Sequence, residues 1–81
     1  MTPVEALGKV ITELREKRGL HRQQLAKAAK LSNTHLDKIE KGKLSTVRLG
    51  VLSRIAMVFG LTQADLTLLV EKRMQHRKRS R

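Results

Sequence analysis

The sequence predicts an all-α domain of five helices. Apolar residues recur at helical spacing in successive segments, and glycines or cap-forming residues bound each segment. Aromatic side chains are almost absent, since Phe59 is the single one among 81 residues. Small β-sheets rely on aromatic and β-branched residues, so a core of Leu, Ile, Val, Ala and Met favours helices.

The first helix is expected over residues 3–18. Thr2 suits the cap position, Pro3 the first helical position, and Glu5 completes a capping box. Gly19 then ends the helix. Its apolar face consists of Val4, Leu7, Val10, Ile11 and Leu14.

Two short helices follow, over residues 22–29 and 33–41. Ser32 supplies a new cap, so the turn between them is only about Lys30 to Ser32. Gly42 ends the second of the pair. Their apolar residues are Leu25, Ala26, Ala29, Leu36 and Ile39.

A fourth helix is expected over residues 48–59, before Gly60. Thr62 and Asp65 then repeat the capping-box pattern and begin a fifth helix. The inward residues of these two helices are predicted to be Leu49, Leu52, Ile55, Ala56, Phe59, Leu66, Leu69 and Val70.

Two glycines, Gly8 and Gly50, lie inside predicted helices. Each costs about 1 kcal/mol relative to alanine. Either they are tolerated surface glycines, or another helix approaches them closely.

The net charge of +11 is concentrated in two segments. Residues 22–48 carry seven Lys or Arg against two acids, and residues 72–81 carry six and no acid. We therefore divide the chain into a helical domain, residues 1–71, and a basic tail expected to be disordered, residues 72–81. The basic balance favours a polyanionic partner, nucleic acid or an acidic membrane surface. The lack of aromatics disfavours base-stacking binders of RNA or single strands.

Several classes of function are disfavoured. The absence of cysteine excludes disulfides and thiolate metal sites. His21, His35 and His76 lack a clustered carboxylate or thiol, so we predict no metal, no cofactor and no catalytic site. Neither a signal peptide nor a membrane-length apolar run is present, which predicts a cytoplasmic protein without a membrane partner.

The pair of short helices joined by a three-residue turn is a helix-turn-helix arrangement. On the helix at 33–41, the outward face begins with hydrogen-bonding side chains and continues with lysines, as a helix that reads DNA requires. That face holds Asn33 at its edge, Thr34, Asp37, Lys38 and Lys41. His35 lies on the Ile39 flank and Glu40 lies beside Leu36.

Short motifs add a family resemblance: Leu-Arg-x-x-x-Gly-Leu at 14–20, Gln-Leu-Ala at 24–26, Leu-Ser at 31–32, Ile-Glu-x-Gly-Lys at 39–43, and RIAMVFGLT at 54–62. Together they resemble the Cro/CI-type (XRE) helix-turn-helix domain of phage repressors and bacterial regulators. The resemblance covers about residues 7–66. It implies a five-helix, lambda-repressor-like bundle.

The resemblance also implies roles for single residues. Family members usually pair an Arg of the first helix with a Glu of the recognition helix, which here are Arg15 and Glu40. Three positions depart from the pattern. His21 replaces a Ser or Thr cap, Arg22 replaces a phosphate-anchoring Gln, and Lys30 replaces the turn glycine. Lys30 is expected to adopt a positive φ or to change the turn.

We assign base reading to the start of the recognition helix and phosphate binding to residues around it. The base-reading candidates are Asn33, Thr34, Lys38 and His35, and the phosphate-binding candidates are Arg22, Gln23, Ser32, Lys41 and Lys43. His35 alternatively packs or caps locally. Asp37 has three alternative roles. It accepts a hydrogen bond from cytosine N4, it weakens binding to other DNA sequences, or it pairs with Lys41 four residues along the helix.

The predicted function is a sequence-specific regulator of transcription that binds double-stranded DNA. The resemblance implies a homodimer that binds an inverted repeat, with half-sites about 34 Å apart. Repression by occlusion is the simplest output, and a phage-type repressor, a restriction–modification controller and an autoregulating antitoxin all fit the sequence. Leu68, off the apolar face of its helix, is the candidate dimer contact. The alternative is an antitoxin that binds a toxin protein and regulates its own operon. A weaker alternative is non-specific binding through the basic tail.

Overall fold

The computed structural model contains five α-helices and, within residues 1–79, no strand. It describes the backbone of residues 1–79 and the side chains of residues 1–75. The helices are α1 (Pro3–Lys17), α2 (Arg22–Ala28), α3 (Asn33–Glu40), α4 (Leu49–Val58) and α5 (Gln63–Arg79). The predicted all-α, five-helix fold class is confirmed.

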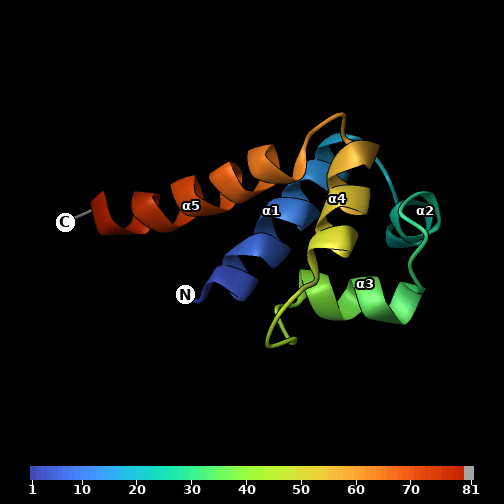
Figure 1. Cartoon of the computed structure of the whole chain (residues 1–81), viewed down its shortest axis with the longest axis horizontal. Coiled ribbons are helices and arrows are strands. Elements are labelled where there is room, and N and C mark those ends of the chain that lie inside the picture. Colours follow the sequence, from blue (N-terminus) through green and yellow to red (C-terminus); the bar gives the residue numbers. More distant parts are fainter. Residues whose placement is uncertain (80–81) are drawn as a thin grey trace.

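Each of the five helices packs mainly against two others. Helix α1 packs against both α3 and α5, while α4 packs against α5 and α2 packs against α3 and α4. Figure 1 shows α2 and α3 at one end of the molecule and α5 extending away from them toward the C-terminus. The helix-turn-helix pair and the end of α5 therefore occupy opposite parts of the molecule.

Both predicted capping boxes are present. The Thr2 N–H donates to the Glu5 carboxylate at 2.9 Å, and the Glu5 N–H donates to the Thr2 hydroxyl at 3.2 Å. At the start of α5, the same two bonds join Thr62 and Asp65 at 2.9 and 3.1 Å. These local bonds satisfy amide groups that a helix start leaves without partners.

The two helical glycines differ. A Cβ on Gly8 would lie 2.6 Å from the Ile39 carbonyl oxygen and closer still to that of Glu40, whereas a Cβ on Gly50 would meet nothing within 4 Å. Gly8 is therefore the point where α1 approaches the end of α3 at backbone distance. Gly50 lies in open space and is a tolerated surface glycine. Each of the two alternatives that the sequence left open therefore applies to one of the glycines.

The core agrees with most of the predicted apolar faces, but Val4 is only half-buried and lies outside the core cluster. Its largest fully buried side chains are Ile11, Leu25, Leu36, Ile39, Ile55 and Leu66. Leu49 was expected to point inward and this is wrong, since it is 64% exposed while Val51 is buried. Leu49 is the first residue of α4, and side chains in a first turn lean back past the helix start.

Helix α5 extends beyond the predicted domain boundary. The sequence placed a disordered basic tail from residue 72 onward, but the backbone is helical through Arg79. Met74 packs against the core, and Arg73 pairs with Glu13 of α1 at 2.6 Å. These contacts and the strong helix propensity of Glu, Lys, Arg, Met and Gln account for the longer helix. Residues 80–81 lie outside the described residues.

Candidate nucleic-acid interface

The turn between α2 and α3 accommodates a lysine where the related family has glycine. Lys30 has φ of 59°, in the left-handed region. The Leu31 N–H donates to the Ala26 carbonyl at 2.8 Å, which closes the end of α2. Arg54 of α4 donates to the Ala29 carbonyl at 2.9 Å. The turn thus keeps the conformation expected of glycine, with strain at Lys30.

The start of α3 separates capping from exposure. The Ser32 hydroxyl accepts from the His35 N–H at 3.0 Å, as expected of a cap. Asn33 and Thr34, the first two residues of the helix, are exposed. Their side chains are thus available at the N-terminal end of α3, where a recognition helix meets base edges.

The remainder of α3 divides into two faces. Leu36 and Ile39 are fully buried and hold the helix against the bundle. Lys38 is exposed on the other side, and His35 is half-buried on a flank. Of the four base-reading candidates, three are therefore exposed and His35 is half-buried.

One ion pair joins α1 to the end of α3. Arg15 Nε lies 2.8 Å from a Glu40 carboxylate oxygen, and its Nη2 donates to the other oxygen at 3.3 Å. The Glu40 side chain is only 3% exposed and that of Arg15 is 13% exposed. Arg15 also donates to the Leu20 carbonyl at 2.9 Å. This bidentate, buried pair fixes the orientation of α3 relative to α1.

Arg22 makes contacts that the sequence did not reveal. Its Nε donates to Glu40 at 3.1 Å, and its Nη1 lies 3.3 Å from Asp37. Asp37 also pairs with Lys41 at 3.2 Å, four residues along α3. The expected phosphate-binding arginine therefore uses two of its nitrogens within the protein.

The other phosphate-binding candidates are accessible. Gln23 is exposed in the first turn of α2, and Ser32 is exposed before α3. Lys41 and Lys43 are exposed at and beyond the end of α3. These residues surround α3 at both of its ends, where phosphate contacts place a recognition helix in register.

The cap of α2 shows how His21 departs from the related family. Its side chain makes no capping bond, as expected of a poor cap. Its N–H instead donates to the Gln24 side chain at 2.7 Å. Half of a capping box therefore remains.

Two further cations serve the fold. Arg18 donates to the Phe59 carbonyl at 3.1 Å, and its guanidinium lies 5.6 Å from the centre of the Phe59 ring. With Arg54 on the Ala29 carbonyl, this places a cation at the C-terminal ends of both α4 and α2. Cations are favourable there because helix carbonyls lack partners. Their partners are distant in sequence, so no local pattern predicts these bonds.

Leu68 belongs to α5, the helix that lies on the other side of α1 from α3 in Figure 1. It is 50% exposed, while Leu66 and Val70 of the same helix are buried. Leu68 is thus accessible to a partner, at a distance from the candidate DNA-reading face.

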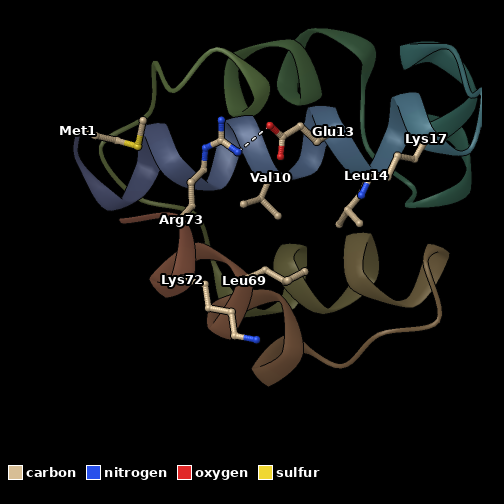
Figure 2. A pocket seen from close by; sticks show the side chains of 8 residues that line it. All are labelled: Met1, Val10, Glu13, Leu14, Lys17, Leu69, Lys72 and Arg73. Atoms are coloured by element: carbon tan, nitrogen blue, oxygen red, sulfur yellow. Dashed lines mark hydrogen bonds and ion pairs between the residues drawn. The ribbon is translucent and has the colours of Figure 1, made fainter. Parts of the chain in front are cut away.

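A cavity of about 580 Å³ lies between α1 and α5 (Figure 2). Val10 and Leu14 of α1 and Leu69 of α5 point into it, and the Glu13–Arg73 pair lies at its edge. Among the side chains of residues 1–75, no group of three or more His, Asp or Glu is arranged to hold a metal ion. Across the described helices, none alone is long and apolar enough to cross a membrane. Helices α4 and α5 reach that threshold only jointly, across a 92° bend.

Comparison with known proteins identifies the family. A family model described as a helix-turn-helix domain matches residues 6–69. The comparison with curated proteins gave no match. Two solved structures of the clp gene regulator ClgR from Corynebacterium glutamicum share the fold.

The first ClgR structure has a TM-score of 0.86 and 24% identity over 96% of this chain and 82% of ClgR. The second has a TM-score of 0.80 and 26% identity over 91% of this chain and 95% of ClgR. The resemblance to the Cro/CI-type family is thereby confirmed. With the family model covering most of its length, the chain belongs to the helix-turn-helix domain family and so to the DNA-binding transcriptional regulators.

Proposed function

We propose that this protein reads a specific double-stranded DNA sequence with α3 in the major groove. The observation that carries the proposal is the division of α3 into an anchored face and an accessible face. Leu36 and Ile39 are fully buried, whereas Asn33, Thr34 and Lys38 are exposed in the order that base reading requires. Anchoring matters because base-specific hydrogen bonds need accurately placed donors and acceptors.

Each exposed side chain suits a particular base edge. The Asn33 amide matches the N6 and N7 atoms of adenine, and the Lys38 ammonium matches the O6 and N7 atoms of guanine. The Thr34 methyl group fits the methyl of thymine. His35, half-buried, contributes less or acts from the flank.

Phosphate contacts on both sides of α3 hold it in the groove. Gln23, Ser32, Lys41 and Lys43 are accessible there, and Arg22 lies beside them with part of its guanidinium engaged. These contacts add affinity and set the register but carry no sequence information.

The regulator acts as a homodimer on an inverted repeat. One short recognition helix reads few base pairs, so pairing two copies across a two-fold axis supplies a longer site. Exposed Leu68 on α5 supports a dimer contact away from α3. Repression by occlusion of a promoter, in the cytoplasm, is the simplest output of such a reader. The similar structures are those of a clp gene regulator, which fits an output on transcription.

In vitro selection from a random DNA pool tests the proposal. We expect one enriched motif with two-fold symmetry and half-sites about 34 Å apart. Asn33→Ala, Thr34→Ala and Lys38→Ala should each cost roughly 1–3 kcal/mol at particular base pairs. Lys17→Ala, which removes the same charge as Lys38→Ala but beside the cavity between α1 and α5, is the matched control and should leave the motif unchanged. A pool without enrichment would refute sequence-specific reading.

An antitoxin is the second candidate, supported by a groove of about 650 Å³ beside the N-terminus of α1. Three helices, α1, α4 and α5, and the loop between α3 and α4 supply its apolar lining. The lining includes Val4, Leu7, Leu44, Val47, Leu52, Leu66 and Val70. A toxin segment would bury such a surface. Co-purification of a stoichiometric partner whose growth inhibition this chain relieves would favour that function, with DNA binding as its regulatory side.

A further inference from the structure

Five charged side chains of alternating sign connect three helices. Arg15 of α1 contacts Glu40 at 2.8 Å, Arg22 of α2 contacts Glu40 at 3.1 Å and Asp37 at 3.3 Å, and Lys41 contacts Asp37 at 3.2 Å. The series begins in the interior and ends at the exposed side of α3. It therefore links the buried anchor of α3 to a residue on its reading side.

Arg22 is the central member of the series. Its Nε bond to Glu40 fixes the plane of the guanidinium, because that group is a rigid planar fork. Glu40 is in turn held by Arg15 and is 3% exposed. The position of Arg22 Nη1, and thus of its partner Asp37, is therefore set by the interior of the protein.

Asp37 occupies the outward side of α3, one turn beyond Asn33. A bare carboxylate there would be repelled by DNA phosphates, but Arg22 and Lys41 neutralise it from two directions. A carboxylate only accepts hydrogen bonds, so it favours a base that presents an amino group. Two bases present an amino group in the major groove, cytosine at N4 and adenine at N6. Adenine N6 lies beside the acceptor N7, which repels a carboxylate, so N4 of cytosine suits an acidic side chain better.

We propose that Arg22 is a positioning residue that holds Asp37 as the acceptor for the N4 amino group of a cytosine in the DNA site. Arg22 adds less to phosphate attraction than a free arginine, because two of its three guanidinium nitrogens contact Glu40 and Asp37. This inference rests on the proposed function, in which α3 lies in the major groove. It adds a base-reading residue and a supporting residue to that site.

Three variants separate positioning from phosphate binding. Asp37→Asn removes the acceptor-only character and leaves the Arg22–Glu40 contact in place. Arg22→Lys keeps the charge but replaces a planar fork by a point donor, which does not span two carboxylates in fixed geometry. Arg22→Gln removes the charge and restores the amide usual in the related family.

Binding is measured on the selected DNA site, on the site with the cytosine replaced, and across a salt series. We expect all three variants to reduce the preference for cytosine at one base pair about tenfold. The double variant Arg22→Lys/Asp37→Asn should lose no more preference than Asp37→Asn alone, since the two residues act as a unit. The salt slope should stay nearly constant in Arg22→Lys and Arg22→Gln.

Opposite results would overturn the inference. If Arg22 is a phosphate anchor, Arg22→Gln lowers the slope by about 0.9 and weakens all sequences alike, while Arg22→Lys keeps the cytosine preference. An unchanged preference in Asp37→Asn also refutes it, and this variant stays informative if the Arg22 variants are unstable. Wild-type protein that selects no motif refutes the proposed function itself, and the inference with it. A selected motif with unaffected cytosine preference refutes the inference alone.

Discussion

Helix α1 holds α3 and α5 by the same type of bond, an arginine–glutamate pair, in two different settings. Arg15 binds Glu40 of α3, whose side chain is 3% exposed, while Glu13 binds Arg73 of α5 and is itself 53% exposed. Around the first pair, α1 and α3 meet at backbone distance at Gly8. Around the second lies the open cavity of Figure 2, and the Arg73 Nε is buried without a partner among the described residues.

The two settings suggest different roles: α3 is held in one orientation, whereas α5 can adjust its position. The reading helix is held by a bidentate buried pair, a close backbone approach and fully buried Leu36 and Ile39. Helix α5 is held by buried Leu66 and Val70, by Met74 against the core, and by an ion pair whose Glu13 is 53% exposed. A base-reading helix needs a single orientation, whereas a helix that meets a partner protein tolerates adjustment.

The largest expected change in the free energy of unfolding comes from removing one ion pair, and it is best measured against removal of the other. Glu40→Gln should lower the free energy of unfolding by about 3 kcal/mol, because it leaves the nearly buried Arg15 without its charge partner. Glu13→Gln should change it by less than about 0.5 kcal/mol, since the exposed pair is screened by water. Urea unfolding measures both. Equal effects would show that burial does not distinguish the pairs.

The two helical glycines give the next largest effect. Gly8→Ala should cost about 2 kcal/mol, because its Cβ would collide with the Ile39 and Glu40 carbonyl oxygens. Gly50→Ala, in open space, should instead stabilise by up to about 1 kcal/mol through helix propensity. Thermal unfolding monitored by circular dichroism measures the signs. A stabilised Gly8→Ala variant would contradict the close approach of α1 and α3.

A smaller effect on folding is expected at Leu68, which is half-exposed on α5. Leu68→Ser should alter the free energy of unfolding by no more than about 0.5 kcal/mol, as usual for surface positions. It should nevertheless weaken the proposed dimer in sedimentation equilibrium. Leu49→Ser, at an equally apolar exposed site on α4, is the matched control and should leave the dimer intact. Wild-type protein that sediments as a monomer with and without DNA would exclude the dimer.

The smallest expected effect is the loss of stability at acid pH that comes from the two capping-box carboxylates. The Thr2 N–H bond lowers the pKa of Glu5, and the Thr62 N–H bond lowers the pKa of Asp65. A lowered pKa in the folded state gives stability that is present above the ordinary carboxyl pKa and is lost as pH falls through the lowered one. Glu5→Gln and Asp65→Asn should therefore lose less stability than wild type between pH 7 and pH 2. Urea midpoints measure this, with Glu16→Gln as the charge-matched control.

The fold could be predicted because its signals are local. Caps such as Thr2 and Thr62 sit three residues from their acidic partners, and apolar spacing marks each helix. The differences between the predicted and the observed helices lie at helix ends. Leu49 satisfies the apolar pattern but begins its helix, and the basic segment after residue 71 lacks apolar spacing but keeps helix formers.

The candidate site was predictable to a lesser extent. A helical wheel places Asn33, Thr34 and Lys38 on the outward side of α3, and the structure leaves them exposed. Their contacts with DNA remain predictions. The partners of Arg22 could not be foreseen, because its contacts with Asp37 and Glu40 depend on how α2 and α3 pack. A count of positive charges in the sequence does not distinguish cations that are ion-paired within the protein, such as Arg22, from cations that are free to bind DNA.

Lys30 has φ of 59°, so the turn between α2 and α3 contains backbone strain that a substitution could remove. A left-handed conformation costs a non-glycine residue roughly 1–2 kcal/mol, and Lys30→Gly would relieve it at an entropic cost of about 0.5–1 kcal/mol. The same substitution would remove one positive charge from a protein that carries a large excess of them. Lys30→Gly would therefore raise thermal stability and lower the attraction to polyanions. It offers a single-residue means of adjusting the two in opposite directions.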